Sequence, residues 1–341
     1  MRKRAFLAIA LLPNPILAML PRAFLALALL PAAARCASQG FYLLAPRTAQ
    51  LLLTDLASGA QTPIGAGLPA PWQAPPDCTP TAVEQTGKWA YTFARRAGAP
   101  PAAPWSVAAM ELRDGSVRKA YALPPAFPPS LPACAHALAE DGGWHAYVAA
   151  VTRDASPRLL LWRFTFTWPH SNESAPVLDV PLASLGMGGA PPTLALAVSN
   201  STAWLALEGG LVGVDLATGL PSRRLPLPGG AVQALQYDVA GAPRRVVGLL
   251  AGASASHLLA FEDTGEGTPV VQRVPTAARV APDNAGWAAL ANDRAALVVL
   301  QRGRALELAL GSGAVVGNVS ACSGGQCAIA CVYEPFVFQR S

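Results

Sequence analysis

Two short stretches of the chain contain nearly the same turn and decide the fold: "TDLASG", Thr54 to Gly59, and "VDLATG", Val214 to Gly219. Each follows a short apolar run, and an aspartate, a small hydroxyl residue and a glycine are typical of tight turns between strands. Weaker copies of the turn end at Gly115, Gly265 and Gly313. Because 254 residues separate Gly59 from Gly313, the copies indicate about five steps of 51 residues.

A second feature repeats in front of these turns. The stretches "TGKWAYTF", "DGGWHAYV", "NSTAWLAL" and "NAGWAALA" each place a tryptophan in a short strand after a polar turn, at Trp89, Trp144, Trp204 and Trp287. The stretch "PRRVVGLL", around Val247, occupies the same slot without a tryptophan. One unit therefore contains a strand, a polar turn, the tryptophan strand, a loop, an apolar strand, the glycine-ended turn and a last strand.

Many of these strands are apolar on successive residues, which in an antiparallel sheet indicates that both faces are covered. Radial packing of sheets covers both faces, because each sheet lies between two neighbours. In these features the chain resembles the β-propeller family, and the order and spacing of its tryptophan strands and glycine-ended turns are similar to those of quinoprotein-like and YVTN-type repeats. The resemblance spans roughly residues 40 to 338 and implies an all-β propeller, in which we count six four-stranded blades.

The two chain ends supply incomplete units. The first unit begins near Phe41 without an inner strand, and the last stretch, "CAIACVYEPFVF", supplies a strand without outer partners. Joining both ends in one blade closes the ring and leaves only short edges. A two-sheet β-sandwich uses similar strands and turns and is the alternative fold.

Composition agrees with a folded chain rich in short strands. Of its 341 residues, 52% are hydrophobic and only 13% are charged, whereas about 25% are charged in typical domains. The 33 prolines and 30 glycines disfavour long helices. Net charge is +5, of which three charges lie at Arg2, Lys3 and Arg4, and no basic run follows, so we expect no nucleic-acid partner.

The N-terminus repeats one phrase, "RAFLAIALLP" from Arg4 and "RAFLALALLP" from Arg22. Each apolar run is shorter than the roughly 20 residues of a membrane span but suits the core of a secretory signal. Small residues follow, with cleavage expected after Ala34 or Ala37. We therefore expect a signal peptide over residues 1–37, one propeller domain over 38–341, a secreted protein and no stable membrane span after cleavage. An uncleaved N-terminal anchor is the alternative.

Sequons and cysteines fit that route. Three N-glycosylation sequons begin at Asn172, Asn200 and Asn318. An oxidising compartment favours disulfides among Cys78, Cys134, Cys322, Cys327 and Cys331, and Cys36 joins them if cleavage follows Ala34. Cys78 and Cys134 occupy equivalent places in adjacent units and are the expected pair. The cysteine-rich tail is expected to hold one local bridge.

No catalytic motif is apparent. The chain has no metalloprotease helix, no nucleophile elbow and no calcium loop, so we expect no metal and no cofactor. His136 is the one histidine that merits a test, while His145, beside Trp144, fits a packing role. Acids recur before the second strands, at Glu84, Glu140, Asp141, Asp238, Asp283 and Glu334. Turn chemistry explains them better than a ring of carboxylates.

Arginines recur in the loops after the tryptophan strands, at Arg47, Arg95, Arg96, Arg153 and Arg294. In a propeller these loops share one face, and clustered guanidinium groups bind carboxylate, sulfate or phosphate through forked hydrogen bonds. The alternative is that they are solvated loop cations. We therefore expect a binding or scaffold module for an anionic ligand or acidic partner, either a protein or a glycan. A propeller hydrolase or lyase, such as a lactonase with a site in the central channel, is the alternative function.

Overall fold

The computed structural model describes residues 40–44, 50–55, 58–75, 81–83, 88–100, 102–128, 131–132, 135–141, 145–166, 173–185, 194–199, 201–238, 244–264, 267–277, 279–280, 288–291, 296–320 and 328–330. By its internal contacts the chain divides after Ala37, and every described residue lies in the unit that begins at Ser38. No helix within the described ranges is long and apolar enough to cross a membrane.

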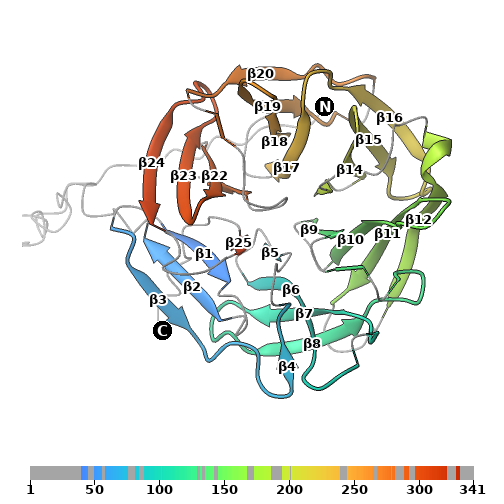
Figure 1. Ribbon diagram of the computed structural model, residues 1–341, viewed down its shortest axis with the longest axis vertical. Coiled ribbons are helices and arrows are strands. Elements are labelled where there is room, and N and C mark those ends of the chain that lie inside the picture. The colour runs from blue at the N-terminus through green and yellow to red at the C-terminus, as the bar shows by residue number, and fades with distance from the viewer. Residues whose placement is uncertain are drawn as a thin grey trace, which may run out of the picture. The chain divides into compact units, whose positions relative to one another are not determined.

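The described strands form six antiparallel sheets (Figure 1). The first sheet combines both ends of the chain, in the order β25 (Ala328–Ala330), β1 (Gly40–Leu44), β2 (Leu51–Asp55) and β3 (Gln61–Ile64). In the second sheet, two short strands occupy the innermost position, and its members are β4 (Trp72–Gln73), β5 (Thr81–Val83), β6 (Trp89–Arg96), β7 (Ser106–Glu111) and β8 (Val117–Ala122).

The other four sheets follow the chain from their innermost to their outermost strand. The third contains β9 (His136–Glu140), β10 (His145–Val151), β11 (Arg158–Thr165) and β12 (Ser174–Pro181), and the short 3₁₀ helix η4 (Leu182–Leu185) follows. The fourth contains β13 (Ala195–Val198), β14 (Thr202–Leu207), β15 (Gly210–Asp215) and β16 (Pro221–Pro226). The fifth contains β17 (Ala231–Asp238), β18 (Arg245–Ala251), β19 (Ser256–Glu262) and β20 (Gln272–Pro275). The sixth contains β21 (Ala288–Ala291), β22 (Ala296–Gln301), β23 (Arg304–Ala309) and β24 (Val315–Ser320).

The six sheets are arranged radially around a ring (Figure 1). Each innermost strand contacts the innermost strand of the next sheet, in the cyclic order β5, β9, β13, β17, β21, β25 and back to β5. The fold is therefore an all-β propeller, as the repeated turns predict, and not a two-sheet sandwich.

The two ends of the chain close the ring in one sheet. Strand β25 pairs antiparallel with β1 through Tyr42 with Ala330, Leu43 with Ile329 and Leu44 with Ala328. This confirms the prediction that the incomplete first and last units share one sheet. Closure gives every sheet two neighbours, so the open edges that remain are the innermost strands around the centre of the ring and the outermost strands at its rim.

The tryptophan slot is confirmed in four sheets and wrong in one. Trp89 lies in β6 and Trp204 in β14, both second in their sheets, and Val247 lies in β18, which is also second. Trp144 and Trp287 are outside the described residues. The strand directly after Trp144, β10, is second in its sheet, whereas β21, directly after Trp287, is the innermost strand of its sheet. The prediction missed the tight hairpin at Arg302 and Gly303, whose positive φ values of 51° and 70° suit a two-residue turn between β22 and β23.

Burial on both faces explains why the sheets need neighbours. All six residues of β14 are buried, and so are all four of β13. Separate apolar clusters lie between the second and third, third and fourth, fourth and fifth, and fifth and sixth sheets. A smaller cluster joins the first sheet to the second. Each fully buried aliphatic or aromatic side chain contributes about 1.5–3 kcal/mol, so an isolated sheet loses this stabilisation on both sides.

The repeated turn that defines the sequence pattern also joins neighbouring sheets. In "VDLATG", the carboxylate of Asp215 accepts hydrogen bonds from the backbone and hydroxyl of Thr218, at 2.8 and 2.9 Å. These donors hold the pKa of the Asp215 carboxyl below its ordinary value. Gly219 closes the turn with a φ of +68°, and its N–H donates to the carbonyl of Asp215 at 2.8 Å. Asp55 and Ser58 form the same contacts in the first sheet.

The closing glycine approaches the outermost strand of the preceding sheet. A methyl group added at Gly219 would lie 2.2 Å from the carbonyl oxygen of Val177 in β12. The equivalent positions pair Gly115 with Ile64 of β3 and Gly313 with Pro275 of β20. The glycine of the turn is therefore required twice, by its backbone conformation and by the closeness of the neighbouring strand.

The substitution Gly219→Ala separates these two requirements when it is compared with Gly209→Ala. Gly209 also has a positive φ, of +85°, but no atom lies within 4 Å of an added methyl group. We expect Gly209→Ala to cost about 1–2 kcal/mol from backbone strain. Gly219→Ala is expected to cost about 1–3 kcal/mol more, because the strands must move apart. Chemical denaturation checks both values, and equal losses would contradict the close packing of adjacent sheets.

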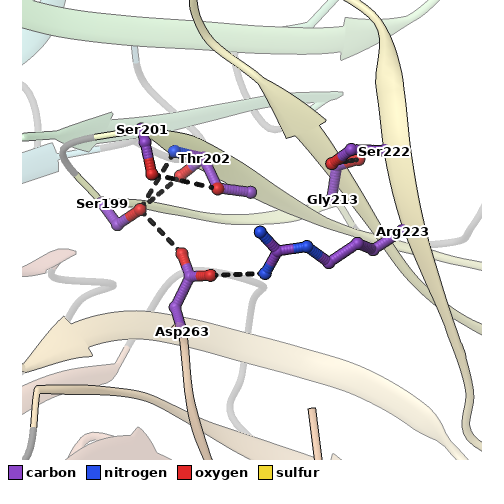
Figure 2. A network of polar contacts seen from close by, with 7 residues as sticks. All are labelled: Ser199, Ser201, Thr202, Gly213, Ser222, Arg223 and Asp263. Carbon is purple, nitrogen blue, oxygen red and sulfur yellow. Dashed lines mark hydrogen bonds and ion pairs between the residues drawn. The ribbon is translucent and has the colours of Figure 1, made fainter. Parts of the chain in front are cut away.

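A buried polar network links the fourth and fifth sheets (Figure 2). Asp263, which follows β19, accepts a hydrogen bond from Ser199 at 2.8 Å and pairs with Arg223 of β16 at 2.7 Å. The side chain of Asp263 is only 1% exposed and that of Arg223 only 14%. The guanidinium group of Arg223 also lies 5.8 Å from the ring centre of Trp204, and that ring meets Phe261 of the fifth sheet edge to face.

Replacing Asp263 with asparagine is expected to destabilise the protein by about 2–3 kcal/mol. Loss of one partner from a buried pair leaves the other charge uncompensated, and the partial exposure of Arg223 moderates the usual cost. Asp179→Asn is the matched control, because Asp179 pairs with Arg158 at the same distance of 2.7 Å on the exposed surface. We expect the control to leave the denaturation midpoint unchanged. An equal effect of both variants would show that the network does not hold the sheets together.

Candidate functional site

Alternation of strand direction gives the propeller two faces with different connections. The connections from second to third strands and from one sheet to the next open on one face, which we call the arginine face. Arg95 and Arg96 are the last two residues of β6 and lie at this face. Arg153 comes two residues after the end of β10 and lies at the same face of the next sheet. Arg47 and Arg294 lie outside the described residues.

Arg95 is stacked on a buried tryptophan. Its guanidinium carbon lies 4.6 Å from the ring centre of Trp105, and that ring belongs to the apolar cluster between the second and third sheets. The Nε atom of Arg95 is buried and has no hydrogen-bond partner among the described residues. A cation held over an indole in this way is stabilised by about 0.5–2 kcal/mol.

Arg96 is placed beside a second tryptophan by the short strand β4. The pairing of β4 with β6 sets Trp72 opposite Arg96 and Gln73 opposite Arg95. The guanidinium carbon of Arg96 lies 6.0 Å from the ring centre of Trp72, and Arg96 is exposed. We call Trp72, Arg95, Arg96 and Trp105 the paired arginine site.

These arginines differ from the others in their charge partners. Within the described ranges, the arginines with carboxylate partners are Arg118, Arg158, Arg223 and Arg245. No ion pair among the same residues involves Arg95, Arg96 or Arg153. Guanidinium groups without a carboxylate partner can bind an anion through charge-assisted hydrogen bonds, and contact with an indole ring limits the positions they take.

The tryptophans of the paired arginine site were not singled out from the sequence. Both follow the same dipeptide, in "APW" at Ala70 to Trp72 and again at Ala103 to Trp105. Trp72 lies in the short strand β4 and Trp105 in the connection between β6 and β7, and neither position belongs to the repeated turn or tryptophan-strand pattern. The recurrence of "APW" was the signal that was available.

The histidines occupy two different environments. His136 is buried between Phe93 and Phe127, with ring centres 5.2 and 5.8 Å away, and its Nδ1 lies 3.1 Å from the carbonyl oxygen of Pro132. His145 lies on the face opposite the arginine face, where its Nδ1 is 2.7 Å from a carboxylate oxygen of Asp141.

The structure describes three of the six acidic residues that recur before the second strands. Glu140 and Asp238 are buried at the ends of β9 and β17, Asp238 lies 3.3 Å from Arg245, and Asp141 contacts His145. The others lie outside the described residues, namely Glu84, Asp283 and Glu334. Within the described ranges, no group of three or more histidine, cysteine or acidic side chains is arranged to hold a metal ion.

One cavity of about 410 Å³ opens on the face opposite the arginine face, at the fifth sheet. Its lining includes Arg245, Phe261, Glu262, Thr264 and Gln272. The two charged side chains are direct neighbours across β18 and β19, so the cavity presents no excess of either charge.

The predicted disulfides and two of the sequons cannot be placed. All the cysteines lie outside the described residues, namely Cys36, Cys78, Cys134, Cys322, Cys327 and Cys331, and so do Asn172 and Asn200. Asn318 is described and lies exposed on β24.

Comparison with known proteins finds similar solved structures but no matching family. No protein-family model matches the chain, and no curated protein matches it. Similar solved structures include a protein of unknown function from Bacteroides caccae, at 11% identity and a TM-score of 0.48, with 86% of this chain and 98% of that chain covered. Apo AztD from Citrobacter koseri is 13% identical, with a TM-score of 0.42 and 84% and 83% covered.

The dihydro-heme d1 dehydrogenase NirN in complex with DHE is also similar, at 14% identity and a TM-score of 0.40. The match covers 84% of this chain but only 55% of that chain. All three TM-scores are below 0.5, so the fold of this protein is argued from its own sheets and not from these structures.

Proposed function

We propose that this protein is a secreted, glycosylated propeller of six blades that acts as a binding module and takes an anionic ligand at the paired arginine site. Each of the six sheets is one blade in this proposal, and the aspartate-to-glycine turns make the repeats quinoprotein-like. The ligand is a sulfated or uronic glycan, or an acidic protein segment that presents the same groups.

One observation carries the proposal. Arg95 and Arg96 are neighbours on one strand, each beside a tryptophan, and neither makes an ion pair within the described ranges. The Nε atom of Arg95 is buried without a hydrogen-bond acceptor among the described residues, and in this proposal the ligand supplies one. Indole rings beside the cations add apolar surface against which a sugar ring can lie.

The route to the cell exterior is supported by the sequence. Two short apolar runs with small residues after them suit an export signal, and three sequons and six cysteines suit an oxidising, glycosylating compartment. Sulfated and uronic glycans occur in that environment, which makes the compartment and the ligand class consistent.

The test removes the three placed arginines together. We expect Arg95→Gln, Arg96→Gln and Arg153→Gln in one variant to lower the affinity for a heparin fragment at least about tenfold, because each charge-assisted hydrogen bond is worth about 1.5–3 kcal/mol. Titration calorimetry measures the change in affinity. The salt concentration is held fixed because contacts between arginine and sulfate or carboxylate groups weaken as ionic strength rises.

A matched control removes the same total charge elsewhere. Arg118, Arg158 and Arg224 are exposed and already bonded to Glu111, Asp179 and the Ser184 carbonyl, respectively. The triple glutamine variant of these three is expected to bind the fragment like the parent protein. Equal loss in both triple variants would indicate a general charge effect, and unchanged binding in the first would exclude the arginine site.

A further inference from the structure

Each sheet of the propeller ends in an outermost strand with one open edge. These strands are β3, β8, β12, β16, β20 and β24. An open edge presents unpaired backbone groups that can add a strand from another chain, and proteins block such edges with proline or with lysine and arginine.

Five of the six outermost strands carry such protection. Proline lies in β3 (Pro63), β12 (Pro176 and Pro181), β16 (Pro221 and Pro226) and β20 (Pro275), and β8 contains Arg118 and Lys119. Strand β24, Val315 to Ser320, reads "VVGNVS" and contains no proline and no charged residue.

Two valines of β24 are exposed. Val315 is 37% exposed and Val316 is 61% exposed, and only two other large hydrophobic side chains in the described part of the chain are exposed, Leu220 and Val270. A six-residue strand of valine, glycine, asparagine and serine, without charge, is the kind of edge that pairs with another copy of itself.

The same strand contains the one sequon whose asparagine the structure describes, Asn318-Val319-Ser320. Asn318 is exposed, and its side-chain oxygen accepts a hydrogen bond from Nε of Arg304 at 2.6 Å. Nη2 of Arg304 also donates to the backbone carbonyl of Asn318 at 3.3 Å. An N-linked glycan is attached through the side-chain nitrogen, so glycosylation leaves the Arg304 contact to the oxygen intact.

We propose that Asn318 carries a glycan that covers the open edge of β24 and prevents this edge from pairing with β24 of a second copy. The glycan performs the role that proline or a cation performs on the other five outermost strands. Two copies without it would pair their β24 strands antiparallel about a two-fold axis, which is the common geometry for such a contact. The inference rests on the secretory route proposed above, but not on the ligand.

The test removes the glycan without touching Asn318. Ser320→Ala destroys the sequon and leaves the Arg304 contacts, while Ser320→Thr keeps the sequon and is the matched control. The full chain is expressed in secreting eukaryotic cells, glycopeptide mass spectrometry measures occupancy at each sequon, and sedimentation velocity measures association. For the parent and Ser320→Thr we expect glycosylated Asn318 and a monomer. For Ser320→Ala we expect a dimer whose dissociation constant is at least about tenfold lower than that of the parent protein.

A second variant keeps the result interpretable. Val316→Lys added to Ser320→Ala places a cation on the open edge and is expected to restore the monomer. A monomeric Ser320→Ala protein, or a double variant that associates as strongly as Ser320→Ala, would overturn the inference. Asn318 found empty while Asn172 or Asn200 is occupied would also overturn it and leave the secretory proposal standing. Failure of secretion with no sequon occupied would instead reject the secretory route and, with it, the glycan at Asn318.

Discussion

The pairing of β25 with β1 is the interaction on which the rest of the structure depends. Strands such as β13 and β14 are buried on both faces, so each sheet requires a neighbour on either side. A linear stack would leave its first and last sheets with one bare apolar face. Because the two ends of the chain form one sheet, no sheet is terminal, and β21 and β22 of the sixth sheet contact β25 of the first.

Contacts between neighbouring sheets add to the closure of the ring, and the proposed binding site lies on one face of it. The close approach of Gly219 to β12 and the buried pair of Asp263 with Arg223 both join one sheet to the next. A scaffold joined in this way holds its connections in fixed places, which keeps Arg95 and Arg96 at the end of β6, each beside a tryptophan. The binding proposal therefore depends on the rigidity of the fold, whereas the glycan on β24 concerns only its outer edge.

The sequence predicted those features that repeat and missed those that occur once. The aspartate-to-glycine turn and the four-strand unit are dictated by local turn chemistry and two-sided burial, and both left a periodic signal. Closure by the chain ends occurs once but was predicted because this period leaves an incomplete unit at each end. A continuous apolar run does not show where one strand ends and the next begins. The hairpin at Arg302 and Gly303 was therefore missed, and β21 was assigned to the second position although it is the innermost strand. The contacts of Trp72 and Trp105 with the arginines arise in irregular connections, and the Asp263 pair joins residues 40 positions apart.

Hydrogen exchange in β1 tests ring closure most directly. Ile329→Pro removes a backbone N–H from β25 at the residue that faces Leu43, and Ile329→Ala changes the side chain alone. If the chain ends close the ring, the proline variant loses amide protection across Tyr42–Leu44 and unfolds at lower denaturant than the alanine variant. Equal protection of β1 and equal unfolding midpoints in the two variants would contradict closure by these strands.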